Sequence, residues 1–323
     1  MSKPLLGVVM DPIASIHPAK DTTLAMLLEA QRRGYDLRYF EQADLRLRRG
    51  VAEGRARQLT VTDSLEHWFE LGEPRNMPLA ELDLILMRKD PPFDTEFIYT
   101  TYILERAAES GVLVVNRPQS LRDMNEKVYT AWFPECCPDT LITRSMADLR
   151  AFLAEQDHVV VKPLDGMGGR SIFAVKKGDN NANVIFETLT DNGRRHALAQ
   201  RYIPEIVHGD KRIILIDGWP VSHVLARIPA PGENRGNLVA GAQPEARPLT
   251  DRDAWICAQV GPALRERGVL FAGLDVIGDY LTEINVTSPT GARELKKLAG
   301  IDVSGALFDA LDAHLRVRRA RSS

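Results

Sequence analysis

The first third of the chain alternates between apolar runs and amphipathic stretches. Leu5 to Met10 is an apolar run of six residues that ends at Asp11-Pro12, and it predicts a short buried strand. Residues 82–87 and 111–116 form two further apolar runs, and residues 96–110 between them carry the periodicity of a helix. Strand, helix and strand in this order predict a parallel sheet with helices on its faces.

A second helix is predicted between the first two strands. Asp21 is a residue type that caps helix N-termini, and Leu24, Leu27 and Leu28 follow it at helical spacing. Gly34 is a typical C-terminal stop for such a helix.

The middle of the chain has a different pattern. His158–Lys162 and Ser171–Lys176 read as strands, and the glycine-rich connection between them is short enough to make them antiparallel. Leu198–Ile203 predicts another strand. Arg212–Ile216 and Pro220–Ile228 flank Asp217-Gly218, which is typical of a hairpin. The chain is therefore predicted to begin as a parallel α/β unit and to continue as α+β.

A last hairpin is predicted from residues 269–277 and 280–285. Residues two apart on a strand share a face, so Glu283 and Asn285 point the same way. A three-residue turn over 278–280 would place Asp275 directly opposite Glu283. A two-residue turn would place these two carboxylates on opposite faces.

Charge and cysteine content exclude several function classes. The 41 Lys and Arg residues nearly balance the 44 Asp and Glu residues, so the chain as a whole has no electrostatic preference for nucleic acid or an anionic membrane. Three cysteines cannot form a disulfide framework, which favours a reducing compartment and a cytoplasmic location. No apolar stretch approaches 18 residues, so no membrane span is expected. The arginines of residues 316–321 predict a solvated basic tail in preference to an RNA contact.

The glycine-rich connection is a candidate phosphate site. It is neither a Walker A loop nor a dinucleotide fingerprint, because it lacks Gly-Lys-Ser/Thr and joins two antiparallel strands. Glycines at 166, 168 and 169 would still let the backbone approach phosphate oxygens, and Lys162 supplies a positive charge. A plain flexible hairpin loop is the competing interpretation.

Asp275, Glu283 and Asn285 form the second candidate site. Two carboxylates and an amide oxygen on one face would suit Mg²⁺, which binds nucleotide phosphates through its remaining positions. A solvated polar strand face is the competing interpretation. The chain has no G-x-S-x-G motif and no His pair at metal-binding helical spacing, so nucleotide chemistry is favoured over a serine hydrolase or a zinc enzyme.

The candidate residues occur in a recognisable order. In chain order they are Lys127, Lys162-Pro-Leu-Asp-Gly-Met-Gly-Gly, Gln200-Arg-Tyr-Ile-Pro, Asp210-Lys-Arg, Gly273-Leu-Asp275 and Glu283-Ile-Asn285. This order resembles the ATP-grasp ligases, and within them it is very similar to the prokaryotic glutathione synthetase family. The similarity covers nearly the whole chain, and long stretches such as residues 25–34 and 87–99 make it specific.

The resemblance implies three parts and a tail. The first is an N-terminal α/β substrate domain over residues 1–122, and the second is a small antiparallel lid subdomain over 123–203. A large α+β subdomain would span 204–316, followed by the basic tail at 317–323. Residues 228–243 are rich in Gly, Pro and Asn and predict a flexible loop that covers the site.

The resemblance also implies a role for each candidate residue. ATP would be bound by Lys127, Lys162, Gly166, Gly168, Gly169, Gln200, Tyr202, Ile203 and Asp210. The metal ligands would be Asp275, Glu283 and Asn285. Arg212 and Arg227 would be catalytic and would also bind substrate, as would Arg88, Arg235, Gly236, Asn237 and Ser288.

The implied reaction is ATP-dependent amide formation between γ-glutamylcysteine and glycine through an acylphosphate. Mg²⁺ or Mn²⁺ would assist, because oxygen ligands suit both ions. The resemblance implies self-association as a homo-oligomer, with a tetramer as the candidate state. Two alternatives stay open: another ATP-grasp carboxylate–amine ligase, and a non-catalytic ATP-binding module.

Overall fold

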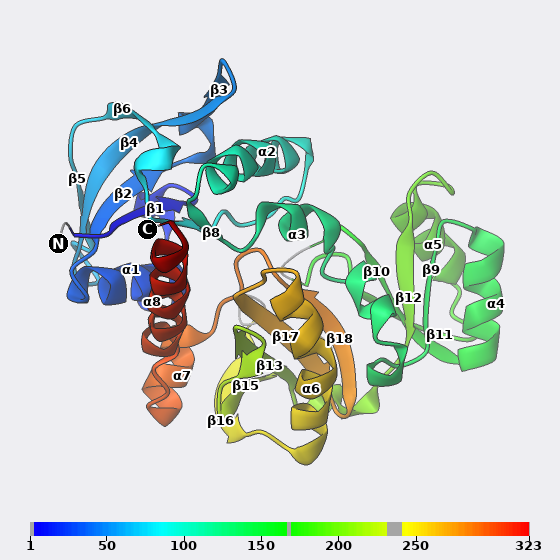
Figure 1. Ribbon diagram of the computed structural model, residues 1–323. Coiled ribbons are helices and arrows are strands. Elements are labelled where there is room, and N and C mark those ends of the chain that lie inside the picture. The colour runs from blue at the N-terminus through cyan, green and yellow to red at the C-terminus, as the bar shows by residue number, and fades with distance from the viewer. Residues whose placement is uncertain (1–2, 167–168, 231–240, 323) are drawn as a thin grey trace.

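The computed structural model describes residues 3–166, 169–230 and 241–322. Three sheets follow one another along the chain, and each packs against helices of its own part of the chain (Figure 1). Short connecting segments carry the chain from one sheet to the next, among them the six-residue helix α3 (Pro118–Asp123).

The first sheet has a parallel core, as the sequence predicts. Its strands are ordered β2-β1-β7-β8, and all three neighbouring pairs are parallel. The bounds are β1 (Leu5–Val9), β2 (Asp36–Phe40), β7 (Leu84–Met87) and β8 (Leu113–Val115), with helices α1 (Thr22–Arg32) and α2 (Thr95–Glu109). The predicted cap is confirmed, because the Asp21 side chain accepts a hydrogen bond from the Leu24 amide at 2.6 Å.

The prediction of a purely parallel first domain is wrong at one edge. An antiparallel extension pairs with β2 and consists of β3 (Leu45–Arg48), β4 (Val51–Val61), β5 (Phe69–Leu71) and β6 (Arg75–Pro78). The buried face of β4 is built partly from Ala52, Gly54 and Ala56, so it gives no apolar run in the sequence. Gly54 is required there, since a Cβ atom would lie 2.6 Å from the Phe40 ring.

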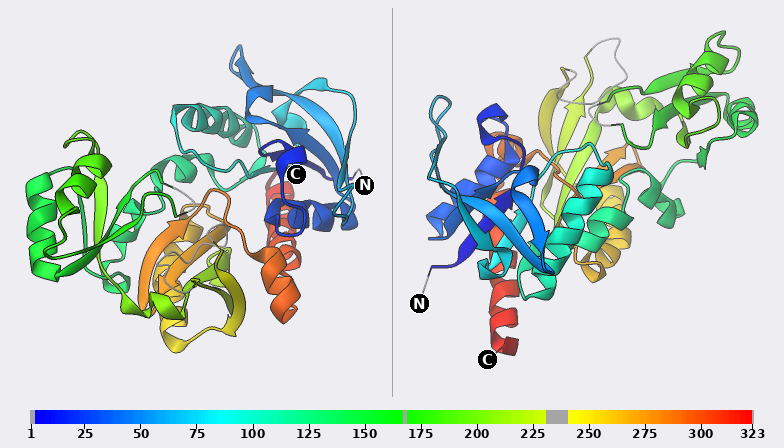
Figure 2. Two further views of the ribbon diagram at one scale, coloured as in Figure 1. Left: turned by 180° about the vertical axis from the view of Figure 1, so that it is seen from behind. Right: turned by 90° about the horizontal axis from the view of Figure 1, so that it is seen from above.

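The second sheet is antiparallel, in the order β11-β10-β12-β9. Its bounds are β9 (Thr140–Thr143), β10 (His158–Pro163), β11 (Phe173–Lys176) and β12 (Ala197–Arg201), with helices α4 (Met146–Gln156) and α5 (Ala182–Thr190). This part has a separate core that includes Val161, Phe186 and Leu149. It projects from one side of the molecule (Figures 1 and 2).

The third sheet carries most of the candidate site. Its order is β16-β15-β13-β17-β18, with β14 paired to β13. The bounds are β13 (Asp210–Ile216), β14 (Trp219–Pro220), β15 (His223–Ile228), β16 (Gln243–Pro248), β17 (Phe271–Ile277) and β18 (Tyr280–Asn285), with helix α6 (Asp251–Glu266). The hairpin predicted at Asp217-Gly218 is confirmed, because Ile216 pairs with Trp219.

The end of the chain returns to the first sheet. Helix α7 (Ala292–Ala299) is followed by α8 (Val303–Ser322), which lies beside α1 (Figure 1). Asp312 on α8 accepts hydrogen bonds from the Tyr35 hydroxyl and, at 2.8 Å, from Arg33. The tail expected at 317–323 is therefore helical as far as residue 322, because residues 317–322 continue α8, and residues 317, 319 and 320 are exposed to solvent, as predicted.

One buried side chain ties the first sheet to the third. The amide of Asn116, just after β8, donates to the carbonyls of Phe271 at 2.7 Å and Val286 at 2.6 Å. Its oxygen accepts from the amides of Leu270 and Phe271. Asn116 therefore holds the start of β17 and the segment after β18 against the carboxyl edge of the parallel strands.

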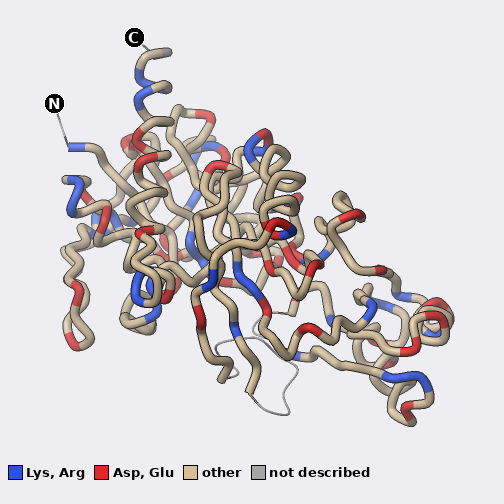
Figure 3. Tube along the Cα trace, turned by 90° about the horizontal axis from the view of Figure 1, so that it is seen from below, with Lys and Arg blue, Asp and Glu red and all other residues tan. Residues whose placement is uncertain are grey.

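Positive and negative residues are interspersed along the whole trace (Figure 3), which agrees with the balanced composition. Among the described residues, no helix is both long enough and apolar enough to cross a bilayer.

Candidate active site

A cavity of about 630 Å³ lies where the three sheets meet. Its walls come from the loop after β7, the segment before Val128, strands β10 to β13, β15, β17 and β18, and the loop after β18. Its charged lining residues are Asp90, Glu126, Lys127, Lys162, Arg170, Arg201, Asp210, Arg212, Arg227, Asp275 and Glu283.

A β-bulge brings the two predicted metal-binding carboxylates together. Ile277 pairs with Tyr280, so the hairpin turn has two residues, Gly278 and Asp279. The pairing then shifts, and Asp275 still lies opposite Glu283. A bulge inserts one extra residue into one strand, which restores the shared face. The expectation that a two-residue turn would separate the carboxylates is therefore wrong.

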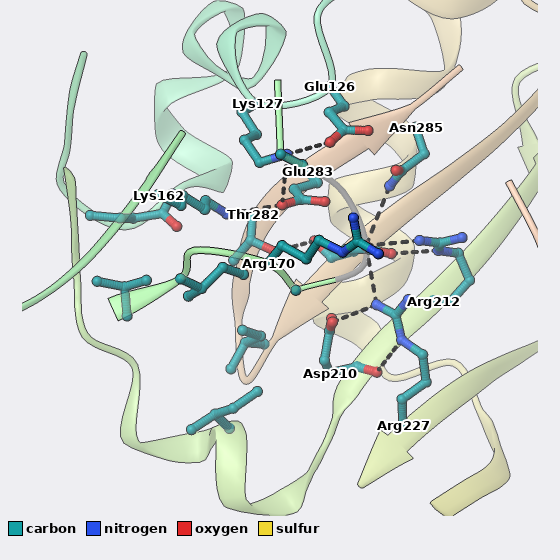
Figure 4. Close-up of a pocket in the computed structure, with 18 of the residues that line it drawn as sticks. Glu126, Lys127, Lys162, Arg170, Asp210, Arg212, Arg227, Thr282, Glu283 and Asn285 are labelled. Carbon is teal, nitrogen blue, oxygen red and sulfur yellow. Dashed lines mark hydrogen bonds and ion pairs between the residues drawn. The ribbon is translucent and has the colours of Figure 1, made fainter. Parts of the chain in front are cut away.

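Four residues form what we call the lysine cluster: Glu126, Lys127, Lys162 and Glu283 (Figure 4). Lys162 Nζ lies 3.1 Å from Glu283 Oε1, and Lys127 Nζ lies 3.6 Å from the same oxygen. Lys127 also pairs with Glu126 and donates to the Gly166 carbonyl at 2.8 Å. Lys127 is 2% exposed, so its alternative interpretation as a surface helix lysine does not hold.

Burial and neighbouring charges both shift the pKa values of residues in the lysine cluster. Burial raises the pKa of the Glu126 carboxyl, and the nearby Glu283 charge raises it further. Burial also opposes ionisation of Glu283, but Lys127 and Lys162 outweigh it and lower the pKa of that carboxyl. Burial lowers the pKa of Lys127, but Glu283 and Glu126 outweigh it, so the pKa is raised and the lysine stays charged.

Four other residues form what we call the arginine cluster: Asp210, Arg212, Arg227 and Asp275 (Figure 4). Arg212 binds Asp275 through two nitrogens, at 2.5 and 2.9 Å. Arg227 Nη2 lies 2.5 Å from Asp210 Oδ2 and 3.1 Å from Asp275 Oδ2. Both arginines are largely buried. Their burial is consistent with an active-site role and is not expected for arginines on a solvated strand face.

The two carboxyls of the arginine cluster titrate differently. Burial opposes ionisation of Asp275, but Arg212 and Arg227 outweigh it and hold its pKa well below the usual range. Burial raises the pKa of Asp210 to about 7 despite the neighbouring Arg227. Asp210 Oδ1 is buried and has no hydrogen-bond partner within the described part of the chain. This acceptor is therefore available to a ligand hydroxyl.

Five other predicted ATP-binding residues also line the cavity. Gln200, Tyr202 and Ile203 lie at the end of β12 and just after it, and Gly166 and Gly169 lie in the connection between β10 and β11. The Tyr202 ring stacks on His158 with centroids 3.8 Å apart. A rigid edge of this kind suits a flat, apolar ligand group.

Arg88, a predicted substrate residue, directly follows strand β7. It is 6% exposed, does not line the cavity, and donates to Thr23 Oγ1 at 3.1 Å and to the Pro289 carbonyl at 2.9 Å. Burial lowers the pKa of Arg88 to about 10. A substrate-positioning role would therefore act through the loop at Pro289. The predicted substrate residue Ser288 lies in that loop and does line the cavity.

Four predicted site residues lie outside the described part of the chain: Gly168, Arg235, Gly236 and Asn237. The central part of the loop predicted over 228–243 also lies outside it.

Four charged lining residues were missed from the sequence: Asp90, Glu126, Arg170 and Arg201. Arg170 directly follows the glycine-rich segment and extends into the cavity (Figure 4). A basic residue after a phosphate-loop candidate was the available signal for Arg170. Glu126 adjoins Lys127, and Asp90 lies within the recognised stretch 87–99, but a lone carboxylate on a loop carries no pattern.

The residues present fit a divalent ion. Across the described ranges, no three His, Cys, Asp or Glu side chains converge as a metal site. Asp275 and Glu283 nevertheless face each other, and Asn285 completes the set with an amide oxygen. Asn285 Nδ2 donates to Gly273 O at 3.2 Å and Asp275 Oδ2 at 3.3 Å, which leaves its oxygen free to act as a ligand. Carboxylate and amide oxygens are hard ligands that suit Mg²⁺ or Mn²⁺.

Solved structures with the same fold define the class. The chain is similar to D-cycloserine synthetase DcsG (TM-score 0.67, 17% identity, covering 96% of this chain and 99% of the other). It is also similar to the ATP-grasp ligase PsnB (TM-score 0.61, 17% identity, covering 96% and 98%). The three-sheet architecture is therefore the ATP-grasp fold.

Sequence comparison narrows the class to one family. Residues 5–122 match the prokaryotic glutathione synthetase N-terminal domain, and residues 126–300 match the prokaryotic glutathione synthetase ATP-grasp domain. The chain is 60% identical to the glutathione synthetase of Pseudomonas putida over 313 residues, covering 97% of this chain and 99% of the relative. It is 58% identical to that of Salmonella typhimurium over 310 residues, covering 96% and 98%. The chain belongs to the prokaryotic glutathione synthetase family.

Proposed function

We propose that this ligase joins γ-L-glutamyl-L-cysteine to glycine at the expense of ATP, giving glutathione, ADP and phosphate. We further propose that the reaction has two steps, formation of an acylphosphate and its attack by glycine, and that both take place in the cavity described above. Family membership makes the chain a C–N bond-forming ligase with glutathione synthetase function that uses ATP and a divalent metal. The observation that carries the residue-level proposal is the meeting of the lysine and arginine clusters in one cavity.

In the first step, an oxygen of the cysteinyl carboxylate attacks the γ-phosphorus of ATP. The bond between that phosphorus and the bridging oxygen breaks, ADP leaves, and an acylphosphate forms. Lys127 and Lys162 would turn from Glu283 to the phosphate oxygens, since a lysine is a compact charge on a flexible stem. Asp210 would accept hydrogen bonds from the ribose hydroxyls through Oδ1, which lacks a partner among the described residues.

In the second step, the amine nitrogen of glycine attacks the acyl carbon. The carbon–oxygen bond to phosphate breaks, phosphate leaves, and the amine loses its proton to water or to phosphate. Arg212 and Arg227 would stabilise the negative charge that develops on the acyl oxygen, because their planar forks suit carboxylate and phosphate. Catalysis by this chain is therefore positioning plus charge neutralisation.

Asp275, Glu283 and Asn285 would hold Mg²⁺ or Mn²⁺. A bound ion of this kind would supply positive charge that offsets the negative charge of the ATP phosphates. The chain's own contribution is the bulged hairpin, which sets the two carboxylates on one face.

Two further expectations remain proposals. We expect a homo-oligomer, as the family suggests. We also propose a cytoplasmic location, which the three free cysteines support.

The test is ADP release by the purified protein with Mg-ATP, γ-glutamylcysteine and glycine, omitting each in turn. We expect release that needs all three. Release that does not depend on glycine would point to another amine acceptor. Binding of ATP without any release would point to a non-catalytic nucleotide-binding protein.

A further inference from the structure

One carboxylate in the cavity differs from the other four. Glu126, Asp210, Asp275 and Glu283 each pair with a lysine or an arginine. Asp90 lines the same cavity, is exposed, and makes no ion pair with any residue that the structure describes. Its carboxylate instead accepts a hydrogen bond from the Ser288 hydroxyl.

Neither of the two cations that precede Asp90 in sequence forms an ion pair with it among the described residues. Lys89 Nζ lies 2.8 Å from Asp11 Oδ1 and donates to the Asp90 carbonyl at 2.6 Å. Arg88 is buried and donates to the Pro289 carbonyl and the Thr23 hydroxyl; the Asp90 charge acts on it without a direct ion pair. The local chain therefore neutralises Asp11 and leaves the Asp90 carboxylate facing the cavity.

The backbone holds this carboxylate in place. The Asp90 amide donates to Asp11 Oδ2 at 2.9 Å, and Ser288 orients the side chain from the loop after β18. That loop is fixed in turn by the contact between Arg88 and the Pro289 carbonyl. A pre-oriented anion in a ligand cavity is suited to a cationic ligand group.

We propose that Asp90 is a specificity-determining residue that binds the α-ammonium group at the γ-glutamyl end of the dipeptide substrate. This inference rests on the proposed function and deepens it. Both substrates contain an ammonium group, but glycine must lose a proton to attack, and a fixed carboxylate would favour the charged form. The γ-glutamyl ammonium stays charged through both steps, so it is the group for which a permanent anionic partner is useful.

The test compares γ-glutamylcysteine with N-glutarylcysteine, which lacks the α-amino group but keeps the reacting carboxylate. We expect kcat/KM of the unaltered enzyme to be on the order of tenfold to a hundredfold lower for N-glutarylcysteine, the usual range for a hydrogen bond to a charged group. In Asp90→Asn, we expect the two substrates to differ by less than about threefold. Ser288→Ala should reduce the preference partially and in the same direction.

The matched control is Glu96→Gln, which also removes one negative charge. Glu96 is exposed at the start of α2 and does not line the cavity. The KM values for ATP and glycine should be unchanged in Asp90→Asn, and thermal unfolding should match that of the control.

The outcomes separate the two proposals. No turnover of γ-glutamylcysteine and glycine by the unaltered enzyme would overturn the proposed function itself. Normal turnover with full discrimination against N-glutarylcysteine by Asp90→Asn would overturn the inference alone. A raised KM for glycine in Asp90→Asn, with that discrimination intact, would also overturn it, because Asp90 would then serve the other ammonium.

Discussion

The lysine cluster and the arginine cluster both neutralise a buried carboxylate with two cations, but the contact geometry differs between them. In each, two cations converge on one predicted metal ligand, Glu283 in the lysine cluster and Asp275 in the arginine cluster. The lysines make single contacts of 3.1 and 3.6 Å, whereas Arg212 makes a two-point contact at 2.5 and 2.9 Å.

This difference indicates a division of work. A lysine holds its charge on a flexible stem and can move to a phosphate, whereas an arginine fork fixes direction as well as charge. We therefore expect lysine variants to weaken ATP binding, and arginine variants to slow the transfer while leaving ATP binding largely intact.

The largest effect is expected for Asp275→Asn, which removes the carboxylate shared by both arginines. We expect kcat to fall on the order of a thousandfold, the upper range for loss of one preorganised charge-stabilising group. The free energy of unfolding should also fall, because Arg212 and Arg227 lose a buried partner. Steady-state kinetics and thermal unfolding measure the two effects. Asp279→Asn, in the turn of the same hairpin, is the control, and an equal loss there would contradict the assignment.

Arg212→Lys tests whether charge alone is sufficient in the arginine cluster. The variant keeps the positive charge but loses the two-point contact with Asp275, so we expect kcat to fall on the order of a hundredfold. The KM for ATP should change less than about threefold. Arg247→Lys is the matched control, since Arg247 is half-buried, lies outside the cavity and pairs with Glu245 at 2.8 Å. Full activity of Arg212→Lys would show that the fork is not needed.

Lys162→Gln tests the role of the lysine cluster in ATP binding. Because a charge-assisted contact to phosphate is lost, we expect the KM for ATP to rise roughly tenfold to a hundredfold. The KM for γ-glutamylcysteine should stay close to its original value. Lys177→Gln is the control, because Lys177 is exposed and pairs with Asp157 at 2.9 Å. Equal changes in both KM values for Lys162→Gln would contradict the division between the clusters.

The smallest effect expected is a pH dependence from Asp210. Its pKa is raised to about 7, so its carboxyl is mostly protonated at pH 6 and mostly charged at pH 8. Because a charged carboxylate is the better acceptor for ribose hydroxyls, we expect ATP to bind up to about tenfold more weakly at pH 6. Titration calorimetry at both pH values measures this, and Asp210→Asn should remove the dependence.

The same shift sets the sign of the Asp210 contribution to stability. A folded-state pKa of about 7 lies above the unfolded value of about 3.9, so the folded state binds the proton more tightly. The contribution is fully present below the unfolded pKa and is lost as pH rises through about 7. Asp210→Asn should therefore flatten that part of the stability profile, and an unchanged slope would contradict the raised pKa.

Sequence patterns predicted the parts of the fold that have strong periodicity. The parallel strands β1, β7 and β8 are continuous apolar runs, and the hairpins have Asp-Gly or Gly-Asp turns, so these were found. The fourth parallel strand, β2, mixes polar and apolar residues and was missed. Strand β4 was missed because its buried face is partly Ala and Gly, and residues 317–322 of α8 were read as a tail because this end of the chain is rich in arginine. In both cases the pairing or packing partner lies far away in the sequence.

The candidate site shows the same limit. Lys127 became a candidate only through the family resemblance, since a single lysine has no spacing to interpret. The bulge between Asp275 and Glu283 was not predicted, because local sequence does not specify one extra residue in a strand. Asp90 was missed because its significance depends on which cations its neighbours have already engaged.

The central claim is that the two clusters transfer phosphate to a carboxylate before the amine attacks. It is tested most directly by trapping the acylphosphate with hydroxylamine in the absence of glycine. The account predicts that the enzyme, given Mg-ATP and γ-glutamylcysteine, forms the hydroxamate and ADP in equal amounts. ADP formed without hydroxamate, under conditions in which added glycine is still ligated, would contradict it.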